Sequence, residues 1–433
     1  MVEKERLVFE TALDDDTLKY LDEIGQADVV VGIPSYRNAR TIGLVAREIA
    51  RGLVLHYPHL RAILVNADGG SSDDSMRIVA RTPVGPRVST LTLLYNGLLG
   101  KGSGVRAIFE VAVRLQARVC VIVEAKVGSI TADWVRNLAQ PILDGEYDLA
   151  TPIYQRHSRM AAPNDLLAYP MTWALYGLDV RQPTGGDFGV SGELAKSFLE
   201  RDVWETDVAR FGSDVWLTTV AVNENCRICQ VDLGAKTNGS KDPALPMDPR
   251  FLQMVGTLFR LVNIYRNTWC LVTGWDVAAP MYGPESGVDL PPLLQPIDAL
   301  WQAAQAGYAR LGRIWKVILT DADYSAVLEM LREPGTDVRF PDDLWARVVY
   351  DFTVVYNKGE GDPDKVAQAL LPLFYIRTIS HMFETAGMRS REREPFVQEQ
   401  ARAFVRQRSY LWDRWVTYVS WLDEGTRTSW SEV

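Results

Sequence analysis

Residues 118–126 read RVCVIVEAK, and this stretch indicates how the first half of the chain folds. An apolar run, residues 119–123, is followed by Glu124, Ala125 and Lys126 and then by a Gly-Ser-Ile-Thr turn. A short β-branched run bounded by turn residues is typical of a strand that is buried in a sheet. We therefore expect a buried strand that delivers Glu124, Ala125 and Lys126 to the rim of that sheet.

The segments before this strand repeat the pattern and alternate with helices. Strand patterns occupy residues 28–34, 60–68 and 88–96, and helical patterns occupy residues 42–55, those from Ser72 onward, and 103–116. This alternation predicts an α/β fold with a mainly parallel, Rossmann-like sheet. Ligands bind beyond the carboxyl ends of the strands in such sheets. Those ends are polar or glycine-rich here: Pro34-Ser35-Tyr36, Asp68-Gly69-Gly70, Asn96-Gly97 and Glu124-Ala125-Lys126.

The second half of the chain has a helical period. Long 3.6-residue patterns run through residues 249–272, 293–319, 322–332, 342–357, 363–386 and 394–423. We therefore predict an N-terminal extension (1–27), an α/β domain (28–244) and an α-helical C-terminal domain (245–433). Asp321-Ala322-Asp323 imitates a metal-binding pair, but it lies in the helical half, where Asp321 is expected to cap the helix 322–332.

Composition excludes several classes of protein. The chain has 433 residues and a net charge of −9, from 46 basic and 55 acidic residues, which argues against nonspecific binding to nucleic acid. The charged start of the chain lacks the apolar region of a signal peptide, and no apolar stretch is long enough for a transmembrane segment. Four cysteines do not make a disulfide framework in so long a chain. These features predict a cytoplasmic protein.

Four segments at the predicted rim are suited to binding a ligand. LVNADGGSSDDS (64–75) places Asp68 at a strand end before two glycines, although Ser72 or Asp73 capping a helix explains the segment equally well. GLLGKGSG (97–104) fails the pattern of an ATP phosphate loop but offers Lys101 at a helix start. RQPTGGDFGVSG (181–192) brings paired glycines before Asp187, and FGSDVWLTTVAV (211–222) begins a helix with Asp214 or merely caps it.

In this order, the segments resemble GT-A-fold glycosyltransferases, and in particular the family of mannosylglycerate, glucosylglycerate and glucosyl-3-phosphoglycerate synthases. The resemblance covers roughly residues 28–240. It implies catalytic roles at Asp187 and Asp214, to which we add Lys126, and acceptor contacts from Arg156 and Thr184. It implies that the donor is bound by Pro34, Tyr36, Asp68, Lys101, Gly102, Glu124, Ala125, Gly185 and Gly186.

The sequence departs from this family at the metal site. The family carries Asp-Ala-Asp where this chain has Glu124-Ala125-Lys126, and a histidine where this chain has Asn238. A charged lysine cannot bind Mg²⁺, and an amide is a weaker ligand than imidazole. Glu124 is then the weak remainder of a metal site. Lys126, with Lys101 and Lys236, is expected to neutralise the leaving diphosphate in place of a metal ion.

The sequence therefore predicts a hexosyltransferase that moves mannose or glucose from a GDP- or UDP-sugar to a small anionic acceptor such as glycerate. The resemblance implies retention of the anomeric configuration. A requirement for Mg²⁺ or Mn²⁺ is doubtful, no organic cofactor is expected, and a homodimer is left open. The alternative is a degenerate, non-catalytic protein that binds a nucleotide sugar as a sensor or partner.

Overall fold

A computed structural model of the chain describes residues 10–237, 248–293, 297–332, 338–359 and 361–419. The chain forms two compact units, and each is assembled from several segments. The first unit contains residues 1–154, 182–245 and 279–288, and the second contains 155–181, 246–278 and 289–433. The domains predicted from sequence are each one continuous segment of the chain. Residues 155–181, which lie inside the predicted first domain, belong to the second unit instead.

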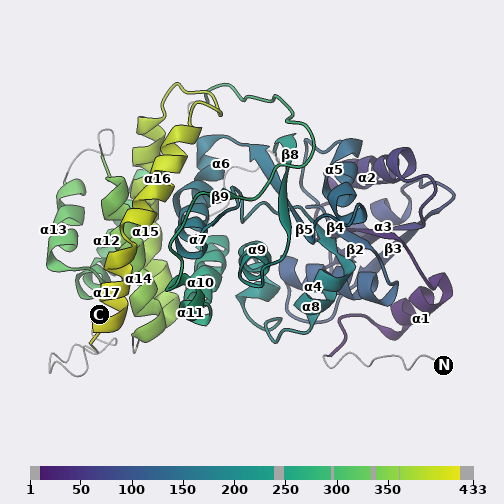
Figure 1. The fold of residues 1–433 in the computed structure, drawn as a ribbon, viewed down its shortest axis with the longest axis horizontal. Helices are drawn as coiled ribbons and strands as arrows, with labels where there is room; N and C mark the ends of the chain where they lie inside the picture. The colour runs from purple at the N-terminus through teal and green to yellow at the C-terminus, as the bar shows by residue number, and fades with distance from the viewer. Residues whose placement is uncertain (1–9, 238–247, 294–296, 333–337, 360, 420–433) are drawn as a thin grey trace. The chain divides into compact units, whose positions relative to one another are not determined.

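The first unit is built on a seven-stranded sheet (Figure 1). Its strand order is β3 (Val88–Leu94), β2 (Ala62–Asp68), β1 (Val29–Ser35), β4 (Val119–Ile122), β7 (Phe188–Ser191), β5 (Leu149–Gln155) and β8 (Ile228–Ala235). β1 pairs in parallel with β2 and β4, and β2 with β3, whereas β7 is antiparallel to β4 and β5. The predicted mainly parallel, Rossmann-like sheet is confirmed.

Helices cover both faces of this sheet. Val29, Val31 and Ile33 of β1 belong to a core that also contains residues of α2 (Ile42–His56) and α5 (Ala132–Leu143). The intervening Gly32 faces Ile108 of α4 (Lys101–Arg114). A Cβ atom at Gly32 would lie 2.3 Å from Ile108 Cγ2, so glycine permits this close approach. The helices of this unit are α1 (Asp15–Ile24), α2 (Ile42–His56), α3 (Ser75–Ala80), α4 (Lys101–Arg114), α5 (Ala132–Leu143), α8 (Gly192–Leu199), the 3₁₀ turn η2 (Asp207–Ala209) and α9 (Ser213–Asn223).

The helix expected from Ser72 begins later, at Ser75, and of the two residues suggested as caps, Asp73 accepts a hydrogen bond from the backbone N–H of Ser75, the first residue of the helix. Asp74 precedes the helix and makes no side-chain cap. Asp73 also accepts hydrogen bonds from the backbone N–H of Ala39 and from the Ser75 hydroxyl, so it fastens the loop that follows β1.

The second unit is helical, as predicted for the C-terminal half. The long patterns correspond to α10 (Asp248–Ile264), α11 (Arg266–Trp269), α12 (Asp298–Ile318), α13 (Asp321–Met330), α14 (Asp342–Lys358), α15 (Pro363–Glu384), α16 (Glu394–Arg406) and α17 (Arg408–Thr417). Residues 155–181 add α6 (Ser158–Pro163), the π-helical turn η1 (Asn164–Ala168), α7 (Tyr169–Tyr176) and the strand β6 (Leu178–Asp179), which pairs with β9 (Val277–Ala278).

The predicted cap of α13 is wrong by one residue. Thr320, not Asp321, accepts the hydrogen bond from the backbone N–H of Asp323. The Asp323 side chain forms an ion pair with Arg347 of α14, in which the closest nitrogen–oxygen distance is 2.7 Å. The Asp323 side chain of the Asp-Ala-Asp segment is therefore used for helix packing.

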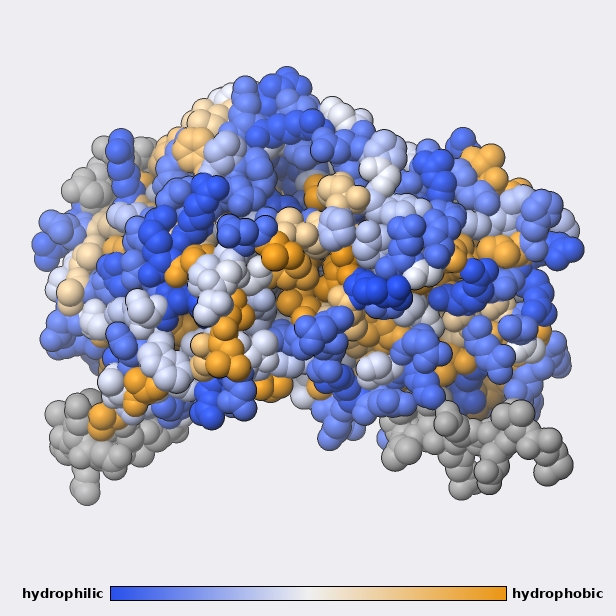
Figure 2. Space-filling view, viewed as in Figure 1, coloured by the Kyte–Doolittle hydropathy of each residue, from blue (hydrophilic) through white to orange (hydrophobic). Residues whose placement is uncertain are grey.

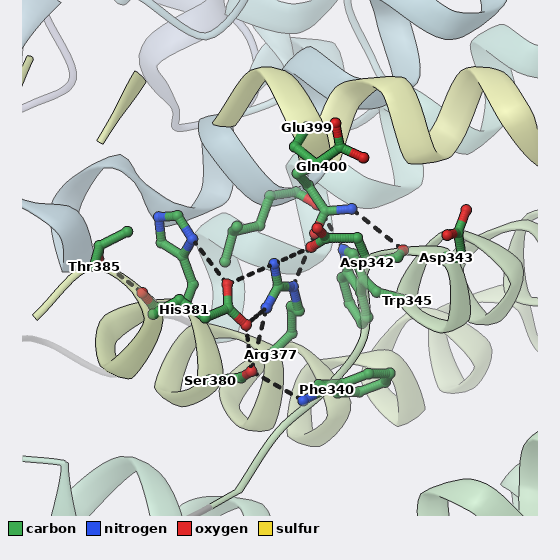
Figure 3. Close-up of polar contacts among 12 residues, drawn as sticks. Phe340, Asp342, Asp343, Trp345, Arg377, Ser380, His381, Thr385, Glu399 and Gln400 are labelled. Carbon is green, nitrogen blue, oxygen red and sulfur yellow. Dashed lines mark hydrogen bonds and ion pairs between the residues drawn. The ribbon is translucent and has the colours of Figure 1, made fainter. Parts of the chain in front are cut away.

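One buried arginine joins three helices of the second unit (Figure 3). The Arg377 side chain on α15 is 1% exposed and forms ion pairs with Asp342 of α14 and Glu384 of α15. Its Nε donates to Gln400 Oε1 of α16 at 2.8 Å. Burial would raise the pKa of Glu384, but contacts with His381 and Arg377 outweigh it and lower the pKa to about 2. This cluster stabilises the packing of α14, α15 and α16.

Polar and charged residues cover most of the face shown in Figure 2. None of the helices in the described part of the chain is both long enough and apolar enough to span a membrane.

Candidate functional site

Charged side chains from five segments meet at the carboxyl edge of the sheet in the first unit. Lys101 begins α4, Glu124 follows β4, Asp187 precedes β7, Asp214 lies in the first turn of α9, and Lys236 follows β8. All five side chains are mostly buried, with exposed fractions between 0% and 16%. We call these five residues the ion cluster.

The Lys101 ammonium group is surrounded by oxygen atoms. Its Nζ lies 2.7 and 2.8 Å from the two carboxylate oxygens of Asp214 and 3.2 Å from Glu124 Oε1. The backbone carbonyl oxygen of Gly186 accepts a further hydrogen bond at 3.0 Å. Burial opposes the charge of Lys101, but the Asp214 and Glu124 carboxylates outweigh it and raise the pKa of Lys101 above its ordinary value. Lys101 is therefore a fixed cation.

Lys236 occupies a second position of the same kind. Its Nζ lies 2.5 Å from Asp187 Oδ2, 2.8 Å from the carbonyl oxygen of Gly185 and 3.0 Å from Glu124 Oε2. It also lies 4.8 Å from the centre of the Tyr154 ring. Glu124 thus bridges the two ammonium groups through its two oxygens.

Three lysines act on the Glu124 carboxylate. Burial alone would raise its pKa, but Lys126, Lys236 and Lys101 together hold that pKa well below the usual range. Lys126 makes the longest of the three contacts, 3.9 Å from Nζ to Oε1, and its side chain is 31% exposed, compared with 9% for Lys101 and 4% for Lys236. Lys126 is therefore the lysine of this group most accessible to a ligand.

Asp187 organises the interior of the site. Its side chain is fully buried and accepts hydrogen bonds from Tyr154, Lys236 and the backbone N–H of Glu124. The side chain of Gln182 in turn donates to the carbonyl oxygen of Tyr154 at 2.8 Å. Sequence reasoning missed Tyr154 and Gln182, although Tyr154 lies near the end of β5 and Gln182 lies in the QPTGGD segment.

Two of the predicted glycines are required by the geometry of the site. Gly186 has a φ of +94°, a left-handed conformation that favours glycine, and a Cβ there would lie 2.9 Å from the Glu124 carboxyl carbon. At Gly102 a Cβ would lie 1.8 Å from the carbonyl oxygen of Val208. Gly102 also donates its N–H to the carbonyl oxygen of Arg210. The structure thus shows Gly102 packed against the η2 turn.

The predicted nucleotide end of the site lies at the carboxyl ends of β1 and β2. Asp68 is fully buried, and its carboxylate accepts hydrogen bonds from Ser35 and from the backbone and side chain of Ser71. Tyr36 follows β1 and is 41% exposed. Pro34 packs against α4 beside Gly104.

The remaining predicted site residues are distributed as follows. Ala125 is buried, and its carbonyl oxygen accepts a hydrogen bond from Thr41 at 2.7 Å. Thr184 lies in the first unit between Gln182 and Gly185. Arg156 belongs to the second unit, where Arg393 donates a hydrogen bond to its backbone carbonyl oxygen. Asn238 lies outside the described residues.

The residues of the ion cluster do not fit a divalent metal ion. Ammonium groups occupy the positions that the oxygen atoms of Glu124, Asp187 and Asp214 surround. Within the described ranges, no three His, Cys, Asp or Glu side chains come together in a way that could hold a metal ion. Any positive charge offered to a ligand by this cluster comes from lysine.

The mainly parallel sheet with its antiparallel strand β7, together with the helices on both faces, defines a Rossmann-like α/β fold. No protein-family profile matches the chain, and no curated protein matches it. The similar solved structures include glucosyl-3-phosphoglycerate synthase from Mycobacterium tuberculosis in complex with Mn²⁺, UDP and glucosyl-3-phosphoglycerate. It has 19% identity and a TM-score of 0.42, and the match covers 66% of this chain and 90% of that chain.

Another is mannosyl-3-phosphoglycerate synthase from Rubrobacter xylanophilus, with 17% identity and a TM-score of 0.40, where the match covers 59% of this chain and 79% of that chain.

Proposed function

We propose that this protein is a glycosyltransferase that moves a hexose from a nucleoside diphosphate sugar to a small anionic acceptor, using lysine side chains where related chemistry uses a divalent metal ion. The ion cluster is the observation that carries this proposal. Three carboxylates hold two buried ammonium groups at the edge of the sheet where ligands of such folds bind.

The chemical need is positive charge beside the leaving diphosphate. Negative charge develops on that group as the glycosidic bond breaks, and fixed cations in a site of low polarity stabilise it. Lys126 is assigned the direct contact because it is the most exposed of the three lysines. Lys101 and Lys236 hold Glu124 and the Gly185-Gly186 turn in place, so they act as positioning residues.

The carboxylates have different roles in this scheme. Asp187 is fully buried, which makes it a positioning residue. Glu124 and Asp214 are 16% and 15% exposed, so either carboxylate is able to hydrogen-bond a hydroxyl group of the bound sugar or acceptor. Arg156 is the proposed clamp for the acceptor carboxylate, because a guanidinium group matches the fork of a carboxylate.

The test is transfer under metal-free conditions. Purified protein is mixed with GDP-mannose, GDP-glucose or UDP-glucose, and with glycerate or 3-phosphoglycerate, in EDTA and in parallel with Mn²⁺. Product is measured by mass spectrometry. We expect a glycosylated acceptor at equal rates with and without EDTA. Product that forms only with added metal would contradict the role of the lysines.

Full burial of Asp187 also favours the second candidate, a non-catalytic protein that binds nucleotide sugars. Calorimetric titration of the donor, together with the transfer assay, distinguishes the catalytic from the non-catalytic candidate. Donor binding without product from any pair of substrates would support the non-catalytic candidate, and absence of donor binding would contradict both.

A further inference from the structure

The loop that directly follows β1 holds an arginine in an unusual backbone conformation. Arg37 has a φ of +54°, a left-handed conformation that is uncommon for a residue other than glycine. Its backbone N–H donates to Ser71 Oγ at 2.7 Å, and the N–H of the next residue, Asn38, donates to Ser75 Oγ at 2.8 Å. Side chains from the loop after β2 and from the start of α3 thus maintain this conformation.

The side chains of Tyr36 and Arg37 lie beside each other in this loop. The Arg37 guanidinium carbon lies 5.1 Å from the centre of the Tyr36 ring, and both side chains are exposed. Among the described residues, Arg37 makes no ion pair with a carboxylate. Its donors therefore face solvent rather than an internal partner.

Tyr36 and Arg37 follow β1, at the edge of the sheet where open α/β folds bind nucleotides. The chain passes from β1 outward to β2 and β3, and then returns to the other side of β1 with β4. The crevice at such a reversal is where open α/β sheets bind nucleotides. Thr41, at the end of the Arg37 loop, donates to the carbonyl oxygen of Ala125, which ties the loop to the Glu124-Ala125-Lys126 segment.

The hydrogen-bonding groups near this loop favour one nucleobase over another. A carboxylate could accept the ring N–H of uracil or guanine, but Asp68 is fully buried and its oxygens are engaged by Ser35 and Ser71. Arginine offers only donors, arranged as a fork. Guanine presents two adjacent acceptors, O6 and N7, that match such a fork, whereas uracil has only O4 on the corresponding edge.

We propose that Arg37 is the specificity-determining residue for the nucleotide, and that it donates to O6 and N7 of a guanine base while Tyr36 supports the guanidinium group. This inference rests on the proposed function and deepens it, because it makes the donor a GDP-sugar.

The test uses nucleotides that differ at single atoms. GDP, IDP, 7-deaza-GDP and UDP are titrated calorimetrically into the full chain in EDTA. Wild-type protein should bind GDP and IDP alike, because both carry O6 and N7. It should bind 7-deaza-GDP and UDP more weakly by about 5- to 150-fold, the discrimination of one bidentate contact.

Two variants and a control complete the test. Arg37→Gly removes the side chain and tolerates the positive φ, so the loop is expected to keep its conformation, and Arg37→Lys keeps the charge without the fork. Both should lose the preference for GDP over UDP, while the neighbouring Arg40→Ala should retain it. Equal binding of GDP and 7-deaza-GDP, or an unchanged preference in Arg37→Gly, would overturn the proposal. Tight binding of UDP with no preference would overturn it while leaving the proposed function intact, and no binding of any nucleotide would overturn both.

Discussion

Replacement of Lys126 by methionine should weaken nucleotide binding without weakening the fold. The ion pair between its ammonium group and Glu124 has a distance of 3.9 Å, and its side chain is 31% exposed, so this pair contributes about 0–1 kcal/mol to stability. A hydrogen bond from the same ammonium group to a diphosphate oxygen contributes about 1.5–3 kcal/mol. That free energy corresponds to a loss of affinity of roughly 10- to 150-fold.

The measurement is calorimetric titration of GDP and UDP into wild-type protein, Lys126→Met and Lys126→Arg, each with EDTA and with Mn²⁺. Lys126→Arg keeps the charge and should lose less affinity than Lys126→Met. Lys19→Met on α1, where the lysine is 74% exposed, is the matched control for loss of a surface charge. The reasoning is refuted if wild-type affinity collapses in EDTA, or if Lys126→Met binds as well as Lys19→Met does.

Three further predictions concern other charged groups. Lys101→Met should lower the free energy of unfolding of the first unit by about 3–5 kcal/mol, because it leaves buried carboxylates without their counter-charge. Urea denaturation measures this loss, and a loss no larger than that of Lys19→Met would contradict the prediction. Burial raises the pKa of Asp351 in α14 to about 6, so its contribution to stability is complete below its unfolded pKa near 3.8 and is lost as the pH rises through 6. Wild-type protein should therefore lose about 2 kcal/mol more than Asp351→Asn between pH 4 and pH 8, and parallel melting curves for the two would exclude this. Arg156→Lys should raise the acceptor KM far more than the donor KM in steady-state kinetics, and equal effects on both would assign Arg156 a structural role.

The sequence predicted the sheet well because its strands are short β-branched runs with polar ends. The run before Glu124 and the run before Asp68 both form parallel strands of the sheet, as their patterns indicate. The place of residues 155–181 in the second unit could not be predicted from sequence patterns. It depends on packing against residues distant in sequence, for example Arg181 against Glu394, which no local pattern reveals.

The candidate site was predicted in part. Motif order indicated Lys101, Glu124, Asp187 and Asp214, and the structure brings these four side chains together. Their pairing was not predictable, because a lysine that pairs with buried carboxylates and one that extends into solvent look the same in a sequence. The buried state of Asp68 was missed for the same reason, since it depends on hydrogen bonds from Ser35 and Ser71.

The ion cluster also has a consequence for protein synthesis. Lys236 follows the last strand of the sheet, whereas its partner Glu124 follows the fourth, so the cluster cannot close until nearly the whole first unit has been translated. A nascent chain that has emerged only as far as β7 would hold Asp187 and Glu124 without one of their cations, which disfavours early compaction around these carboxylates. Ribosome-bound chains should accordingly gain protease resistance in this region only once residue 236 has left the exit tunnel, which makes the end of β8 a late checkpoint in folding.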